Sequence, residues 1–371
     1  MKLLIGGSPC THWSIAQTKN RETEASGIGW ELFLNYRIAR DKYKPDYFLY
    51  ENNKSMSPAI RTQITAELGV EPVLINSALL SAQNRQRLYW VGRRNPDGTY
   101  SQVPVEQPED RGILLRVILE SGAVTWLEKA YTQRASAGTK QGVSNILRHI
   151  ETNGKFGYMG VAEPIDACCV AQRGRYIGEG GKVAQHFEAR TDGKSVTLCG
   201  NGGGLGAKTG LYATPVGGPD GKAWPVYEVR DGFIAIKGKR YPIKLRDGFY
   251  IIRKLTVTEC KRLQTVPDTY AFPVSDTQAY KMLGNGWTVD VIAHIMSHFT
   301  GLTEEPVEVL SMYDGMSCGH IALDKLGAEI TTYYATEIDK YAIQTTQHNF
   351  PETIQLGDAF QVRNDDWRVQ E

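Results

Sequence analysis

The feature that most constrains the fold is the stretch LLIGGSPC at residues 3–10. Its apolar run, residues 3–5, predicts a short buried strand, and the two glycines that follow end that strand. Pro9 then stiffens the turn and places Cys10 at the carboxyl edge of the sheet that the strand joins. Ligands of open α/β sheets bind at this edge, so the Cys10 thiol is expected where it can reach a substrate.

A lone cysteine is more often a small buried side chain than a nucleophile, but other reactive side chains also stand at the ends of predicted strands. The strand Tyr47–Tyr50 is followed directly by Glu51. Arg85 and Arg87 stand just before another strand, Leu88–Gly92. A thiol, a carboxylate and paired guanidinium groups at strand ends together predict an active site.

Strands and helices alternate over most of the chain. Helices are expected over residues 30–43 and 58–68, the second with a proline in its first turn, and a strand over residues 72–76. The alternation returns near the end, with helices over 256–263, 288–299 and 319–326 and strands over 307–313, 331–338 and 353–356. This pattern predicts an α/β fold with a mostly parallel, Rossmann-like sheet. A chain of 371 residues has room for a second domain.

Residues 95–252 have a different composition and are expected to form that second, mostly β domain. Short helices are predicted over 126–131 and 146–150, and glycine dominates residues 174–221. Short alternating runs predict a β-ribbon over residues 226–229, 233–236 and 241–245. The chain is therefore divided into residues 1–94, 95–252 and 253–371.

The charge balance excludes a chain that is basic throughout, because the formal net charge is +1. The densest basic run, residues 237–246, fits either contact with a phosphate backbone or a solvated hairpin.

The six cysteines include no Cys-x-x-Cys pair and no signal peptide precedes them, which indicates reduced thiols and a cytoplasmic protein. No apolar run is long enough to span a membrane. His294 and His298 share a helix face without a third ligand, so no metal site is expected.

Several motifs resemble those of the cytosine-C5 DNA methyltransferases. GGSPC at residues 6–10, YENN at 50–53 and QNRQR at 83–87 resemble motifs IV, VI and VIII of that family. Further along the chain, three stretches resemble motifs IX, X and I, namely residues 253–264, 283–289 and 309–319. Motif I normally opens the domain, so the chain resembles a circularly permuted member of the family. Joining residue 371 to residue 1 would restore the usual order, which is physically permissible where chain ends lie close together.

The resemblance implies S-adenosylmethionine as the cofactor. Glycines 315 and 319 let backbone amides approach a ligand at a helix N-terminus, and Glu337 can accept hydrogen bonds from ribose hydroxyls. Asp358 is expected to accept from an adenine amino group. Ser317 replaces a glycine of the dinucleotide-binding fingerprint, and Tyr313 stands where the family usually has Phe. The complete set of expected cofactor-binding residues is Tyr313, Asp314, Gly315, Met316, Ser317, Gly319, Glu337, Ile338, Asp358 and Asn285.

The family's chemistry implies a role for each residue of the expected active site. Cys10 would attack C6 of cytosine, Glu51 would contact N3 and N4, and Arg85 and Arg87 would hold O2 and a phosphate. The base must leave the duplex, and the loop of residues 11–29 is expected to close over it. Residues expected to contact the substrate or to brace its pocket are Pro9, Ser14, Gln83 and Asn285.

The resemblance implies a DNA (cytosine-5-)-methyltransferase acting on double-stranded DNA, with residues 95–252 as its target-recognition domain. The glycine-rich stretch 200–206 lacks the Gly-Lys-Ser/Thr ending of a phosphate loop and is interpreted as a loop that faces DNA. The alternatives are a tRNA cytosine-C5 methyltransferase, a DNA-binding homologue without activity, and one half of a two-chain enzyme. The large insert and the intact Cys10, Glu51, Arg85 and Glu337 favour the DNA enzyme. It is expected in a bacterial or viral setting, nucleoid-associated, with a cognate restriction endonuclease as a functional partner but not a stable subunit.

Overall fold

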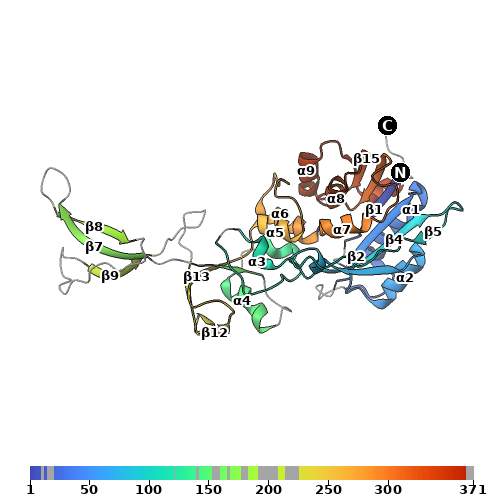
Figure 1. Ribbon diagram of the computed structural model, residues 1–371. Helices are drawn as coiled ribbons and strands as arrows, with labels where there is room; N and C mark the ends of the chain where they lie inside the picture. Colours follow the sequence, from blue (N-terminus) through green and yellow to red (C-terminus); the bar gives the residue numbers. More distant parts are fainter. Residues whose placement is uncertain are drawn as a thin grey trace. The chain divides into compact units, whose positions relative to one another are not determined.

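The computed structural model of the protein divides into two compact units (Figure 1). The first comprises Met1–Glu120, Leu127–Lys140 and Leu255–Glu371, and the second comprises Ser121–Trp126 and Gln141–Lys254. The structure describes residues 1–9, 12–14, 21–120, 122–138, 142–152, 159–164, 168–176, 183–190, 208–213 and 225–364. Residues 95–120 thus belong to the first unit, although their composition resembles that of the segment that follows.

Eight strands of the described chain form one sheet in the first unit, in the order β16-β15-β14-β1-β2-β4-β3, with β5 paired to β4. The strands are β1 (Lys2–Gly6), β2 (Tyr47–Asn53), β3 (Pro72–Asn76), β4 (Gln86–Arg94), β5 (Tyr100–Gln102), β14 (Val307–Met312), β15 (Ile330–Thr336) and β16 (Ile354–Gly357). Strand β1 lies between β14 and β2 and runs parallel to both. The strand predicted from residues 3–5 is therefore central, as its continuous apolar run indicates.

The sheet is mixed but mostly parallel, as expected, because among its described strands only β4 runs against the others. Strand β4 runs antiparallel to β2, β3 and β5. A parallel connection needs a crossover of a dozen or more residues, and only Ser77–Arg85 joins β3 to β4. As a result, the start of β4 reaches the same sheet edge as the carboxyl ends of β1 and β2. This reversal brings the arginine motif to the predicted site.

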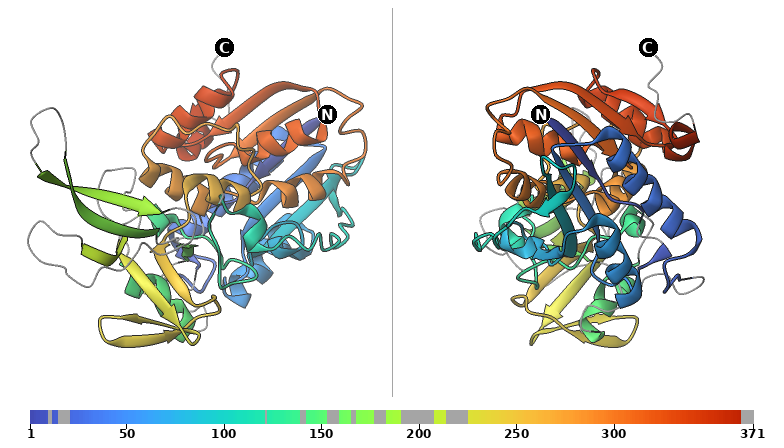
Figure 2. Two further views of the ribbon diagram at one scale, coloured as in Figure 1. Left: turned by 60° about the vertical axis from the view of Figure 1, so that its left-hand side comes forward. Right: turned by 90° about the vertical axis from the view of Figure 1, so that its right-hand side faces the viewer.

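Helices cover both faces of this sheet (Figure 2). One face packs against α1 (Gly27–Tyr43), α2 (Pro58–Leu68) and α10 (Ala359–Asn364), whose apolar side chains share a core with Leu4 of β1. Gly319 of α8 (Cys318–Leu326) packs on the other face, against Ile5. Among the described residues of this unit, the other helices are α3 (Leu115–Ile118), η2 (Ser77–Leu79), η3 (Ala135–Gly138), α5 (Val257–Leu263), α6 (Asp276–Asn285), α7 (Val289–Met296) and α9 (Lys340–Asn349).

The second unit is mostly β. Its described strands form a five-stranded antiparallel sheet, β12-β11-β10-β13-β6, and a three-stranded sheet, β8-β7-β9. The elements are α4 (Val143–Glu151), β6 (Val161–Pro164), β7 (Cys168–Tyr176), β8 (Val183–Arg190), β9 (Lys208–Ala213), β10 (Val226–Arg230), β11 (Phe233–Ile236), β12 (Lys239–Pro242) and β13 (Gly248–Arg253). The predicted ribbon is present, with β12 beginning earlier than expected, whereas residues 126–131 form no helix. The glycine-rich stretch 200–206 lies outside the described residues.

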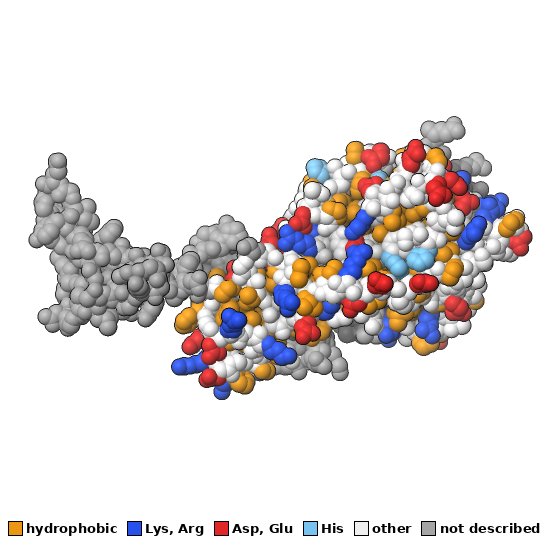
Figure 3. Space-filling model, viewed as in Figure 1, with side chains coloured by type: hydrophobic (Ala, Val, Ile, Leu, Met, Phe, Trp, Pro, Cys, Tyr) orange, Lys and Arg blue, Asp and Glu red, His pale blue; other side chains and the backbone are white. Residues whose placement is uncertain are grey.

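Within the described ranges, no helix is both long and apolar enough to cross a bilayer. The same ranges contain no cluster of His, Cys, Asp and Glu that could hold a metal ion. His294 instead contacts the Glu106 carbonyl oxygen at 2.8 Å, and His298 contacts the His294 carbonyl oxygen at 2.9 Å. Lys and Arg side chains lie interspersed with Asp and Glu on the face shown in Figure 3.

His320 on α8 is expected to make the protein sensitive to acid. Its ring stacks on Phe350 and Tyr333, with centroid distances of 3.8 Å and 4.7 Å, and only 4% of the residue is exposed. Burial lowers the pKa of His320 from 6.5 to about 4, with Glu352 opposing the shift. The unfolded chain therefore binds this proton more tightly, so stability is full above pH 6.5 and falls as the pH drops toward 4. The loss corresponds to roughly 3 kcal/mol.

Urea unfolding of the His320→Phe variant at several pH values tests this expectation. The variant keeps an aromatic ring in the stack and should lose less stability than the wild type between pH 6.5 and 4. His298→Gln, at a half-buried position just after α7, is the matched control and should retain the wild-type slope. An unchanged slope in His320→Phe would assign the acid sensitivity to other groups.

Candidate active site

The turn after β1 is packed tightly against β2. A Cβ atom added to Gly7 would lie 2.6 Å from the Glu51 carbonyl oxygen and 3.0 Å from Glu51 Oε2, so only glycine allows this approach. The Ser8 hydroxyl lies 2.6 Å from the Tyr50 hydroxyl, and Asn52 Nδ2 donates to the Ser8 carbonyl oxygen at 3.2 Å. The chain is thus directed along the Glu51 side chain just before residue 10.

Cys10 itself lies outside the described residues, as do residue 11 and residues 15–20. Pro9 is exposed and Ser14 is half-buried. The described ends of the predicted closing loop are anchored, because Trp13 is fully buried and its Nε1 donates to Glu22 Oε2 at 3.1 Å. Glu22 Oε1 also accepts from the Gly29 backbone N–H at 3.2 Å. Trp13 and Gly29 are thus both tied to Glu22.

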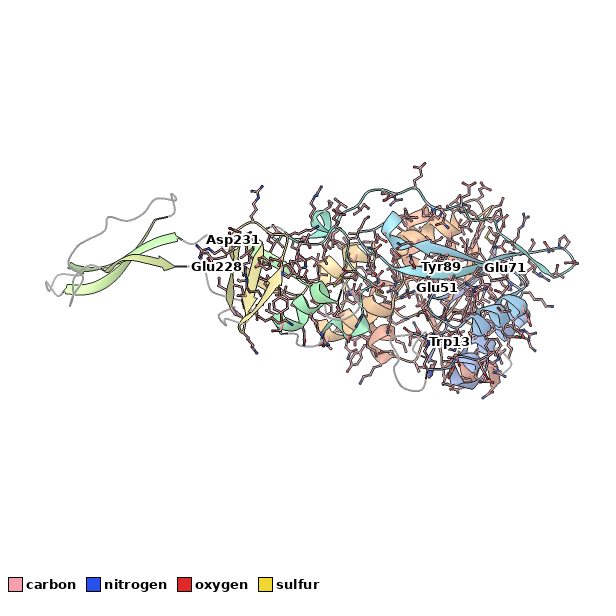
Figure 4. The ribbon with its side chains drawn as sticks, turned by 90° about the horizontal axis from the view of Figure 1, so that it is seen from below. Trp13, Glu51, Glu71, Tyr89, Glu228 and Asp231 are labelled. Carbon is pink, nitrogen blue, oxygen red and sulfur yellow. The ribbon has the colours of Figure 1, made fainter. Side chains whose placement is uncertain are left out.

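Glu51 and Arg87 meet at the sheet edge, as the motifs predict. Glu51 on β2 lies opposite Tyr89 on β4 (Figure 4 labels both), and its side chain is 12% exposed. Arg87 Nε lies 3.1 Å from Glu51 Oε1. The indole N–H of Trp287 donates to Glu51 Oε2 at 3.0 Å, a partner that the sequence analysis missed. The only feature of the sequence that points to Trp287 is its place within the stretch that resembles motif X.

Arg85 has a different environment from Arg87. Its guanidinium is buried and donates to two carbonyl oxygens, that of Gly284 at 3.3 Å and that of Gly286 at 2.9 Å. Arg85 therefore joins the start of β4 to the end of α6. Gln83, expected to contact the substrate, is instead fully buried, and its Oε1 accepts from the Gln133 backbone N–H at 3.4 Å.

The turn over residues 313–319 is braced by the side chain of Asp314. Asp314 accepts hydrogen bonds from Ser311 at 2.6 Å, from Tyr333 at 2.8 Å and from Ser317. Burial raises the pKa of the Asp314 carboxyl to about 6, and these hydrogen bonds oppose the shift. The side chains of Asp314 and Ser317, expected at the cofactor, thus hold the turn itself.

Three other expected cofactor residues also have structural roles. A Cβ on Gly319 would lie 2.2 Å from Ile5 Cδ1, so glycine here lets α8 pack on β1. Met316 is buried, and its carbonyl oxygen accepts from the Tyr270 hydroxyl at 2.8 Å. The Tyr313 hydroxyl donates to the Leu32 carbonyl oxygen at 2.7 Å, and burial raises the pKa of Tyr313.

Gly315 is an accessible position in the turn over residues 313–319. Its φ is +61°, and an added Cβ would meet no atom within 4 Å. Glu337 Oε2 accepts from the Gly315 backbone N–H at 2.8 Å, and Ile338 beside it is 75% exposed. Asp358 and Asn285 are also exposed. A carboxylate, an open backbone turn and an exposed apolar side chain fit the ribose and the flat ring of an adenosine.

The two groups of residues lie along one edge of the sheet. Gly6 at the end of β1 pairs with Met312 at the end of β14 and with Tyr50 of β2. The Gly315 turn follows β14, and Glu51 follows Tyr50. The predicted cofactor residues and the predicted catalytic residues therefore flank the turn that leads to Cys10.

Two other cysteines have described side chains, and both are buried: Cys260 on α5 and Cys318 on α8. Burial raises the pKa of the Cys318 thiol to about 12. A thiol with this pKa stays protonated near neutral pH and is a poor nucleophile. Cys318 is thus unsuited to nucleophilic catalysis.

Comparisons with known proteins agree with these motifs. Residues 1–300 match the family model described as C-5 cytosine-specific DNA methylase. Type II methyltransferase M.HpaII of Haemophilus parainfluenzae is 26% identical over 302 residues, covering 78% of this chain and 69% of that protein. Orphan methyltransferase M.SPRI of Bacillus phage SPR is 24% identical over 360 residues, covering 79% and 81%. Type II methyltransferase M.HhaI of Haemophilus parahaemolyticus is 22% identical over 303 residues, covering 79% and 74%.

Proposed function

The chain belongs to the C-5 cytosine-specific DNA methylase family, and from this we propose that it methylates C5 of cytosine within a specific double-stranded DNA sequence. The observation that carries the proposal is the paired placement of Glu51 and Arg87, 3.1 Å apart, beside the turn that leads to Cys10. This arrangement would supply a carboxyl group and a cation at one end of a planar base, beside the turn after which Cys10 follows in the sequence.

In the proposed reaction the Cys10 thiolate adds to C6 of a cytosine that has left the duplex. This addition makes a C6–S bond and gives C5 the electron density to attack a methyl group. Glu51 hydrogen-bonds the N3 and N4 edge of the base, where charge builds up, and Arg87 holds the Glu51 carboxylate and the substrate. Loss of the C5 proton to a base then expels the Cys10 thiolate and restores the aromatic ring.

S-adenosylmethionine, when bound, supplies the methyl group as an electrophile. The residues around Gly315 fit its adenosine part, because Glu337 offers a carboxylate to the ribose hydroxyls and Ile338 an exposed apolar surface to adenine. Asp358 is within the exposed part of the next strand-to-helix turn and is suited to the adenine amino group. We assign the cofactor to this surface.

The order of the motifs supports a circular permutation. The family match covers residues 1–300, whereas the resemblance to motif I lies over residues 309–319. In the sheet, β1 nevertheless pairs in parallel with β14, the strand that leads into motif I. Helix α10, late in the chain, contacts α1 through Arg363 and Asn35 at 3.0 Å. The cofactor half thus packs beside the catalytic half that precedes it in the chain.

We assign target recognition to the second unit, so that Ser121–Trp126 and Gln141–Lys254 take the place of the expected insert, residues 95–252. The rest of the chain would form the methyltransferase domain. A cytoplasmic, nucleoid-associated role beside a cognate restriction endonuclease would suit such an enzyme; among its relatives, M.HpaII is named a type II methyltransferase and M.SPRI an orphan methyltransferase.

Bisulfite sequencing of DNA from bacteria that express this chain tests the function. We expect methylcytosine within one short sequence motif, absent from cells that carry the empty vector. Unmodified DNA from a folded protein that binds S-adenosylmethionine would contradict the proposal. Methylcytosine in the cells' tRNA in that case would identify the RNA enzyme instead.

A further inference from the structure

The Glu51 carboxylate is held at both of its oxygens. Arg87 Nε on β4 lies 3.1 Å from Oε1, and Trp287 Nε1, on the segment after α6, donates to Oε2 at 3.0 Å. A carboxylate with one partner can still rotate about its own side-chain bonds. Two partners on different elements fix the plane of the group, which is what a base-contacting carboxyl requires.

The backbone on both sides of Trp287 is itself fixed. Arg85 binds the carbonyl oxygens of Gly284 and Gly286, and the Thr288 hydroxyl donates to Gln264 Oε1 at 2.9 Å. The indole is thus presented from a rigid segment. This also gives the buried Arg85 a role: it holds the segment that carries the indole.

The segment that carries Trp287 also lies against the start of helix α8. A Cβ added to Gly286 would be 3.2 Å from Cys318 Sγ and 3.6 Å from Met316 Sδ. Trp287 therefore lies between the Gly315 turn, which is assigned to the cofactor, and Glu51, which is assigned to the cytosine base. Because the indole is uncharged and donates only, it orients the carboxylate without adding charge to the site.

We propose that Trp287 is a positioning residue for Glu51, acting through its indole N–H on Oε2. The proposal rests on the function proposed above and assigns a role in the reaction to a residue outside the predicted catalytic set. Trp287 fixes the orientation in which the Glu51 carboxyl group meets the N3 and N4 edge of cytosine. Its contribution lies in the chemical step and not in the binding of DNA or cofactor.

Trp287→Phe tests this role, because phenylalanine keeps an aromatic ring and removes only the donor. We expect kcat to fall by about 10-fold, as for loss of one hydrogen bond to a charged group, with KM for DNA and for S-adenosylmethionine within about 2-fold of the wild type. A kcat equal to that of the wild type would overturn the proposal, as would a loss confined to KM.

Two further variants separate positioning from a general structural effect. Trp90→Phe is the matched control, because Trp90 Nε1 donates to Thr65 Oγ1 at 2.9 Å in the buried core; it should lower Tm and leave kcat unchanged. In a Glu51→Ala background, measured under single-turnover conditions, Trp287→Phe should cause no further loss. A further 10-fold loss there would show that the indole acts elsewhere, whereas absence of methyl transfer by the wild type would contradict the proposed function itself.

Discussion

Replacement of Cys10 by serine is expected to abolish methyl transfer while sequence-specific DNA binding persists. A serine hydroxyl is not ionised near neutral pH and is a far weaker nucleophile than a thiolate, so C6 of cytosine is not attacked and C5 is not activated. The expected loss in kcat is on the order of 10³-fold or more, as for removal of the nucleophile in other covalent enzymes.

Transfer of a labelled methyl group to DNA and a gel-shift titration on the same preparations measure the two effects separately. Cys260→Ala is the matched control, because this buried cysteine lies on α5 and has no assigned role in the reaction. It should retain transfer. Loss of DNA binding in Cys10→Ser to the same extent as loss of transfer would contradict the nucleophilic role.

Replacement of Glu337 by alanine is expected to weaken S-adenosylmethionine binding by about 100-fold, because two charge-assisted hydrogen bonds to the ribose are lost. Glu337 also accepts from the backbone N–H groups of Ile338 at 2.7 Å and Asp339 at 2.8 Å, so the variant will also be less stable. DNA binding should change little. Isothermal titration with each ligand measures the two affinities.

Asp339→Ala provides the control for that loss of stability. Asp339 is the N-cap of α9, accepts from the Tyr341 backbone N–H at 3.0 Å and pairs with Lys281 at 2.7 Å. Its loss should cost about 1 kcal/mol of stability and leave cofactor affinity unchanged. Equal weakening of S-adenosylmethionine binding in Glu337→Ala and Asp339→Ala would show that Glu337 only braces the turn at Gly315.

Local signals made some elements predictable to the residue. Helix α2 spans Pro58–Leu68, as expected, because both of its ends are marked in the sequence. Ser57 caps the first turn by accepting from the Ile60 backbone N–H, Pro58 suits the first helical position, and Gly69 adopts φ +73° at the end. The motifs at Glu51 and Arg87 were also informative, since the sequence places each residue at one end of its own strand and the structure has Glu51 near the end of β2 and Arg87 near the start of β4.

Other features depend on contacts between distant parts of the chain, which no local pattern reveals. The apolar run of β4 predicts a strand but not its direction, so the reversal that brings Arg87 to Glu51 was missed. Helix α6 was not predicted, and with it the carbonyl oxygens that Arg85 binds. Trp287 donates to Glu51 although the two residues are far apart in the sequence, and the burial of Gln83 depends on packing around Gln133.

The central place of β1 has a consequence for synthesis of the chain. The ribosome makes Leu3–Ile5 shortly before β2, which can pair with one edge of that strand soon afterwards. The other edge must wait for β14, Val307–Met312, which follows only after the second unit and most of the first have been made. Until then this buried apolar strand has an unpaired edge, which is the kind of surface that promotes misassociation. Yield in cells is therefore expected to depend on how quickly the last part of the chain follows, and on chaperones that cover the nascent strand.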